Sequence, residues 1–126
     1  MICIFPKKVL NEIKAVCAEG KEEHCGMLLG EKNPDGFIVD DFLPLPNAIT
    51  TMASFTISPE VMIDAMAQAG ERKIIGIYHN HPCGAHPSWI DLKGMLTLPA
   101  LIWLIIGIDG MGVFKINTQK DSSHPP

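Results

Sequence analysis

The amino-acid sequence predicts a mixed α/β domain in which helices flank one β-sheet. Apolar segments rich in β-branched residues alternate along the chain with segments whose apolar residues recur at helical spacing. Glycine and proline mark the boundaries between these segments. A chain of 126 residues is long enough to bury roughly two-thirds of its unfolded surface in one core. We expect a single domain over residues 1–117, followed by a flexible polar tail over 118–126.

The first segments predict a short strand followed by a helix. Residues 2–5 favour the strand, and Pro6 suits the first turn of a helix because its φ angle is already helical. Gly20 is expected to stop that helix. The apolar residues at helical spacing are Val9, Leu10, Ile13, Val16 and Cys17.

A hairpin and a further strand follow. Residues 24–30 predict a strand, the Asn-Pro-Asp-Gly sequence at 33–36 predicts a turn, and residues 37–46 predict the partner strand. Residues 55–57 predict another strand, whose edge is a candidate for pairing with an extended peptide.

Helices and strands alternate through the second half. Ser58, Pro59 and Glu60 supply a cap residue, a first-turn proline and an early acid for a helix that runs to about Arg72. The segments predicted after it are a buried strand over 73–81, a helix over 88–96, a strand over 101–108, a turn over 109–112 and a strand over 113–117.

Composition argues against several classes of function. The net charge of −4 comes without a basic stripe, so nucleic acid is not an expected partner. The apolar block 95–108 contains Pro99 and is shorter than the roughly twenty residues that span a membrane. The cysteines form no CxxC pair and the N-terminus does not resemble a signal peptide, so we expect a cytoplasmic protein.

The sequence His79-Asn80-His81 ends the predicted strand 73–81. Side chains at i and i+2 of an extended chain share one face, with Cα atoms roughly 6 to 7 Å apart, so both imidazoles can reach one metal ion. Asp91 lies in the first turn of the helix predicted after Pro87, where it would project back toward the histidines. Two histidines and a carboxylate match catalytic zinc, which keeps one position open for water.

Other donors compete for the same ion. His86 lies five residues after His81, in a loop whose direction the sequence does not fix. Cys83 is a softer ligand in the same loop. His24 fits the surface of a strand better than a metal site, but it remains a rival.

Two further roles have alternatives. Ser88 and Asp91 have the spacing of a capping box, in which the serine hydroxyl and the acid satisfy free N–H groups at a helix start. A hydrolytic site also needs a carboxylate base, and Glu22 and Glu23 stand just before the strand 24–30.

The chain resembles the JAMM (MPN+) metalloproteases in three segments: Glu23-His24-Cys25-Gly26-Met27-Leu28-Leu29-Gly30, His79-Asn80-His81-Pro82 and Pro87-Ser88-Trp89-Ile90-Asp91. The HxHP motif followed by Ser-x-x-Asp is the specific part, and Asn47 to Pro59 is similar to a further stretch of the family. The resemblance covers most of residues 1–117. It implies the MPN-type, cytidine-deaminase-like fold, in which helices flank a curved mixed sheet.

The resemblance also implies a zinc-dependent hydrolase. It assigns Zn²⁺ to His79, His81 and Asp91, with a water completing the tetrahedron. It assigns the general base to Glu23, and it gives Ser88 a role in stabilising the oxyanion of the tetrahedral intermediate.

The match departs from the family at one point, because the loop between His81 and Asp91 is one residue shorter than usual. The insertions of members specialised for ubiquitin chains are also absent, so the minimal domain resembles the prokaryotic members. Such a member is implied to be a peptidase or isopeptidase acting on a ubiquitin-like or sulfur-carrier protein that ends in Gly-Gly. A homodimer is compatible with this interpretation.

Two other classes of protein share some of these features. An MPN-type scaffold has the fold without catalysis, although such scaffolds usually lack the ligands and base that are intact here. A cupin-like barrel also uses HxH, but the helical segments 7–19 and 59–72 do not suit a barrel. The motifs of zinc deaminases and metallo-β-lactamases are absent from the sequence.

Overall fold

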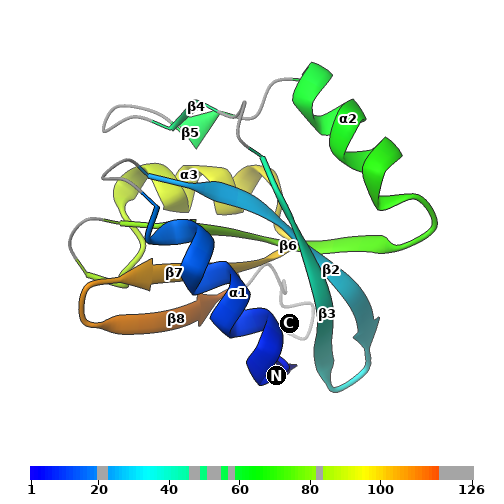
Figure 1. The fold of residues 1–126 in the computed structure, drawn as a ribbon, viewed down its shortest axis with the longest axis horizontal. Helices are drawn as coiled ribbons and strands as arrows, with labels where there is room; N and C mark the ends of the chain where they lie inside the picture. The colour runs from blue at the N-terminus through cyan, green and yellow to red at the C-terminus, as the bar shows by residue number, and fades with distance from the viewer. Residues whose placement is uncertain (20–22, 46–48, 51–54, 57–58, 82–83, 117–126) are drawn as a thin grey trace, which may run out of the picture.

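A computed structural model describes residues 1–19, 23–45, 49–50, 55–56, 59–81 and 84–116 of the chain (Figure 1). Its helices and strands are, in chain order, β1 (Ile2–Ile4), α1 (Lys7–Cys17), β2 (Cys25–Asn33), β3 (Gly36–Pro44), β4 (Ile49–Thr50), β5 (Phe55–Thr56), α2 (Pro59–Ala69), β6 (Lys73–Asn80), α3 (Trp89–Thr97), β7 (Ile102–Gly107) and β8 (Gly110–Phe114). Among these described residues, no helix has both the length and the apolar character needed to cross a membrane.

The described strands form one mixed sheet of six strands in the order β1-β3-β2-β6-β7-β8, and β4 pairs separately with β5. The pairs β1–β3 and β6–β7 are parallel, and the other neighbours in the large sheet are antiparallel. The sheet is curved, with α1 in front of it and α3 behind it in Figure 1. The predicted mixed α/β class, a curved sheet flanked by helices, is therefore confirmed.

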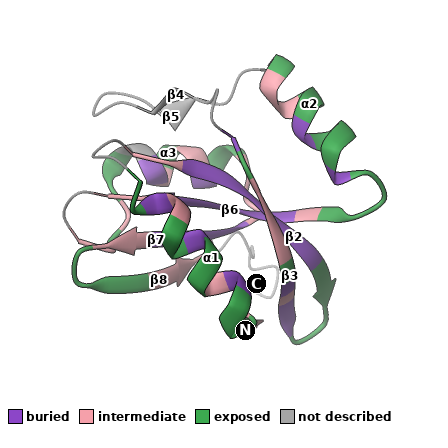
Figure 2. Cartoon of the chain, viewed as in Figure 1, coloured by how far each residue is buried: buried purple, intermediate pink, exposed green. Residues whose placement is uncertain are grey.

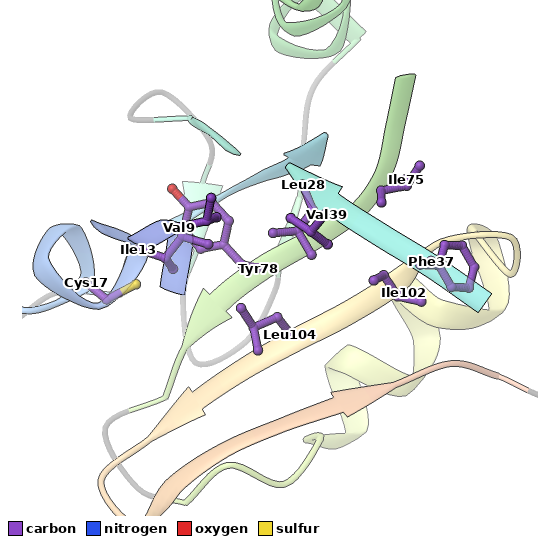
Figure 3. Close-up of a cluster of buried hydrophobic side chains, with 10 residues drawn as sticks. All are labelled: Val9, Ile13, Cys17, Leu28, Phe37, Val39, Ile75, Tyr78, Ile102 and Leu104. Carbon is purple, nitrogen blue, oxygen red and sulfur yellow. The ribbon is translucent and has the colours of Figure 1, made fainter. Parts of the chain in front are cut away.

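Two apolar clusters fill the two faces of the sheet, and both are buried along the central strands (Figure 2). The first joins α1 to the sheet through the helical positions predicted from the sequence (Figure 3). The second packs α2 and α3 on the opposite face. Residues of the first cluster include Val9, Ile13, Cys17, Leu28, Tyr78 and Leu104, and those of the second include Met27, Leu29, Ala65, Ile77, Met95, Trp103 and Ile105.

A β-bulge in β6 decides which face its last side chains meet. Leu28 of β2 pairs with Gly76 but Leu29 pairs with Ile74, so Ile75 is an extra residue without a partner. Ile75 then packs on the α1 face together with Tyr78, three positions later rather than two or four. Because one extra residue flips every later side chain to the other face, the bulge places His79 on the face of the sheet that carries α3.

The predicted elements differ from the observed ones mainly at their ends. The helix expected to reach Arg72 stops at Ala69, because Gly70 adopts a positive φ of 65° and ends it. The turn expected over 109–112 is shorter, since only Ile108 and Asp109 separate β7 from β8. Predictions that fall outside the described residues are those for Gly20, Pro46, Ile57, Ser58 and residues 117–126.

The packing of α1 can be tested with a matched pair of substitutions. Ile13 is fully buried at 0% exposure and Ile63 on α2 is 65% exposed. We expect Ile13→Ala to lower the free energy of unfolding by about 2–5 kcal/mol, because it leaves a cavity in the core. Ile63→Ala should change it by about 0.5 kcal/mol or less. Urea denaturation of both variants measures the difference, and equal losses would contradict the proposed packing of α1.

Candidate metal centre

The carboxyl end of β6 carries the two histidines of the HxH sequence. His79 lies between Cys25 of β2 and Ile105 of β7, so hydrogen-bonded strands hold it on both sides. The backbone N–H of His81 donates to Ile106 O at 2.8 Å and continues the parallel pairing beyond the end of β6. The two imidazole rings face the same space, with centroids 4.6 Å apart. The predicted sharing of one face is confirmed.

Asp91 reaches both histidines from the first turn of α3. Its Oδ1 lies 2.6 Å from His79 Nε2 and its Oδ2 lies 2.9 Å from His81 Nε2. The helix begins directly after Ser88, and the carboxylate also accepts a hydrogen bond from Ser88 N at 2.7 Å. These contacts connect the start of α3 to the end of β6.

The cluster is buried, and the low local dielectric strengthens the electrostatic interactions among its side chains. Side-chain exposure is 2% for His79, 13% for His81 and 1% for Asp91. Burial by itself raises the pKa of the Asp91 carboxyl, but hydrogen bonds from His79 and from Ser88 N, together with the charges of the two histidines, lower the pKa below its usual value. Asp91 is therefore ionised at neutral pH, as a metal ligand must be.

The three side chains fit a zinc ion by donor type and by distance. One donor atom from each of His79, His81 and Asp91 can be chosen so that all lie within 4.8 Å of one another. Zinc bonds of about 2.0–2.1 Å place tetrahedral donors about 3.3 Å apart, which is about 0.4 Å more than the contact of Asp91 with His81 and about 0.7 Å more than its contact with His79. Three protein donors are the number found in catalytic zinc sites.

Glu23 lies beside this cluster, immediately before β2. Its Oε1 is 3.9 Å from His79 Nδ1, and 22% of its side chain is exposed. The contact is longer than a hydrogen bond, and it places the carboxylate near the centre. Glu22, the rival for the role of base, lies outside the described residues.

Asn80 fixes the segment that carries Glu23, a role the sequence analysis missed. Its side chain points away from the two histidines, and Oδ1 accepts a hydrogen bond from His24 N at 2.6 Å. The N–H of Asn80 in turn donates to His24 O at 3.3 Å. The only signal in the sequence was the alternation of a strand, which sends the middle residue of HxH toward the opposite face.

Ser88 forms the capping box that its spacing with Asp91 predicted. Its Oγ accepts a hydrogen bond from Asp91 N at 3.2 Å, while its own N–H donates to the Asp91 carboxylate. The hydroxyl hydrogen of Ser88 is not used in this cap. Trp89, the next residue, is 73% exposed.

The rival ligands are not part of the cluster among the described residues. His86 is exposed, and the metal-competent group consists of His79, His81 and Asp91. The His24 ring contacts Glu19 O through Nε2 at 2.6 Å. Cys83 lies outside the described residues.

Comparison with known families places nearly the whole chain in one of them. Residues 6–119 match the family described as prokaryotic homologs of the JAB domain. The match contains all three residues of the buried cluster and also Glu23, Asn80 and Ser88. No curated protein matches the chain at a significant level.

Solved structures share the fold at low sequence identity. A protein from Desulfitobacterium hafniense is similar over 99% of this chain and 100% of its own, with 22% identity and a TM-score of 0.70. A protein from Salinibacter ruber is similar over 96% and 85%, with 24% identity and a TM-score of 0.64. A JAB1/MPN domain protein from Archaeoglobus fulgidus is similar over 91% and 89%, with 19% identity and a TM-score of 0.58. The MPN-like fold expected from the sequence is thereby confirmed.

Metal binding by the cluster can be tested with two histidine variants. Free zinc at about 100 times its Kd should raise the free energy of unfolding of the wild-type chain by about 2.7 kcal/mol, because only the folded state holds the three donors together. His81→Ala should lose most of this gain, and His86→Ala should keep it. Thermal unfolding with and without zinc measures both, and an equal loss in the two variants would contradict the assigned ligands.

Proposed function

The chain belongs to the prokaryotic homologs of the JAB domain, and from this premise we propose that it is a zinc-dependent peptidase or isopeptidase. The observation that carries the proposal is the buried group of His79, His81 and Asp91 at the end of β6. A group of this composition is typical of the JAMM zinc site. The proposed substrate is a ubiquitin-like or sulfur-carrier protein, cut after its C-terminal Gly-Gly.

The proposed chemistry divides between the ion and the chain. Zinc bound at this centre would polarise the scissile carbonyl and lower the pKa of a water to about 7. Glu23 takes a proton from the attacking water and later returns it to the leaving amine. Its position 3.9 Å from His79 Nδ1 and its partial exposure support this role, because the carboxylate can be reached from solvent and from the centre.

Ser88 and Trp89 extend the proposed site toward the substrate. The hydroxyl hydrogen of Ser88 is free to donate to the oxyanion while Oγ continues to cap α3. Capping thus holds the hydroxyl in place instead of competing with the catalytic role. Trp89 offers an exposed aromatic surface next to the centre, of the kind that contributes strongly to protein–protein contacts.

An extended substrate tail is proposed to pair with β5. This strand is hydrogen-bonded to β4 and lies against α3, the helix that carries Asp91. A tail added to a strand edge is held by its backbone, which suits a Gly-Gly sequence without side chains. The tail would then lead directly to the metal centre.

A fusion with a Gly-Gly junction tests the activity. The zinc-loaded chain should cleave a ubiquitin-like protein from a reporter joined after its terminal Gly-Gly. Cleavage should stop with a chelator and return on addition of zinc, because zinc supplies the Lewis acid of the proposed reaction. Gel analysis and mass spectrometry locate the cut, and the control is a junction in which Gly-Gly is replaced by Pro-Pro. Cleavage that continues undiminished in chelator would refute the metal-dependent mechanism.

The base is tested by a substitution that preserves shape. Glu23→Gln should retain zinc and lower kcat at least about a hundredfold, because general base catalysis contributes roughly 10²–10⁴-fold. Glu31→Gln, an exposed acid near the far end of β2, is the matched control and should leave kcat unchanged. Zinc content by elemental analysis and steady-state kinetics give the two readouts. Full activity in Glu23→Gln would eliminate this residue as the base.

A further inference from the structure

We propose that Gly107 and Asp109 are positioning residues that hold the loop between the metal ligands His81 and Asp91, and that they thereby set the affinity for zinc. This inference rests on the proposed function, because it assumes that the cluster binds metal. Neither residue belongs to the three motifs that resemble the JAMM family. Both lie where β7 turns into β8.

The chain passes the end of β7 after it leaves His81. The strands β6 and β7 are parallel neighbours joined through α3, so the chain must leave β6 and cross the end of β7 to begin the helix. It crosses at Gly107. A Cβ atom at Gly107 would lie 2.3 Å from both Gly84 C and Ala85 N, so the loop backbone occupies the space that any side chain would need.

A hydrogen bond holds the loop where it passes Gly107. Asp109 Oδ1 accepts the backbone N–H of Ala85 at 2.9 Å. The same carboxylate also lies over Gly84, where a Cβ atom would meet Asp109 Oδ2 at 3.3 Å. The Asp109 side chain therefore bonds the loop at Ala85 and lies next to it at Gly84.

The hydrogen bond between Ala85 and Asp109 lies in the segment that connects two of the candidate metal ligands. The ligands His81 and Asp91 come from a strand and a helix, and the segment between them determines their separation. Its first end is held by the bond from His81 N to Ile106 O, and its last by the capping box of Ser88 and Asp91. Asp109 is the described side chain that holds the stretch between these ends. Partners that hydrogen-bond metal ligands directly change metal affinity 10–100-fold when they are removed, and Asp109 acts on the ligands through the loop, so we expect an effect of about tenfold.

The chain supplies a matched control at its other hairpin. The turn between β2 and β3 also consists of two residues, Pro34 and Asp35, and a glycine with positive φ follows, Gly36. The β7–β8 turn has the same pattern, in which Asp109 precedes Gly110 with φ 137°. Asp35→Ala thus removes the same side chain from the same place in a turn, but at the end of β2 opposite to Cys25, the partner of His79.

The experiment measures zinc affinity by competition with a fluorescent chelator in the full chain. Asp109→Ala and Gly107→Ala should each weaken binding by about tenfold, the first by removing the bond to Ala85 and the second by displacing the loop. The zinc affinity of Asp109→Asn should stay within about threefold of wild type, because the amide oxygen still accepts the hydrogen bond. If the charge of Asp109 were what matters, Asp109→Asn would weaken zinc binding as much as Asp109→Ala does. Asp35→Ala should bind zinc like wild type.

Cobalt substitution gives a readout of geometry that loss of stability alone would not produce. The visible absorption bands of bound Co²⁺ depend on the number and arrangement of its ligands, and they should change in Asp109→Ala but not in Asp35→Ala. Circular dichroism establishes that each variant is folded, and if Gly107→Ala is not, the alanine and asparagine variants at Asp109 decide. Wild-type affinity in folded Asp109→Ala would overturn this inference alone. A wild-type chain that binds no zinc would overturn the proposed function as well.

Discussion

The carboxylate of Asp91 is shared between a helix start and two imidazoles, and the arrangement of the candidate centre depends on it. One oxygen meets His79, and the other meets His81 and the N–H of Ser88. A buried carboxylate without such partners would cost several kcal/mol, so the folded state strongly favours the arrangement that keeps all of them. The first turn of α3 therefore cannot rotate or slide without leaving buried polar groups unpaired, and the geometry of the ligands is maintained by the same contacts that begin the helix.

A second constraint acts upstream, in the bulge of β6. If Ile75 were paired regularly, the side chains after it would exchange faces, and the histidines would point toward the apolar cluster under α1. The bulge instead places His79 against Trp103, with ring centroids 6.3 Å apart and the planes nearly perpendicular. Trp103 in turn packs on α3 where Gly94 has no side chain to obstruct it. The bulge thus determines which face of the sheet the histidines of the HxH sequence occupy.

Most of the fold and the grouping of His79, His81 and Asp91 could be predicted from the sequence, because those features depend on local chemistry. The spacing of Val9 and Ile13 indicates a helix with one buried face, and His79 and His81 share a face because a strand repeats every two residues. The bulge and the roles of Asn80 and Asp109 could not be predicted. They depend on which strands become neighbours and on where backbone atoms of distant segments meet, as they do at His24 and Ala85. The glycines at 110 and 112 suggested a longer turn than the one observed, because glycine is as suitable for close approach to Phe114 as for turning the chain.

The candidate ligands and the candidate base come from different parts of the chain, and this division affects how such a domain can evolve. All three candidate ligands lie within the β6–α3–β7 unit, whereas Glu23 precedes β2 and is 22% exposed. A single substitution at Glu23 would leave the core and the metal ligands intact. A substitution at Asp91 would instead remove the carboxylate that contacts both buried imidazoles and would break the capping box of α3. A descendant of such a domain can therefore lose the candidate base in one step while keeping the fold and the buried cluster, but it can hardly lose the cluster first.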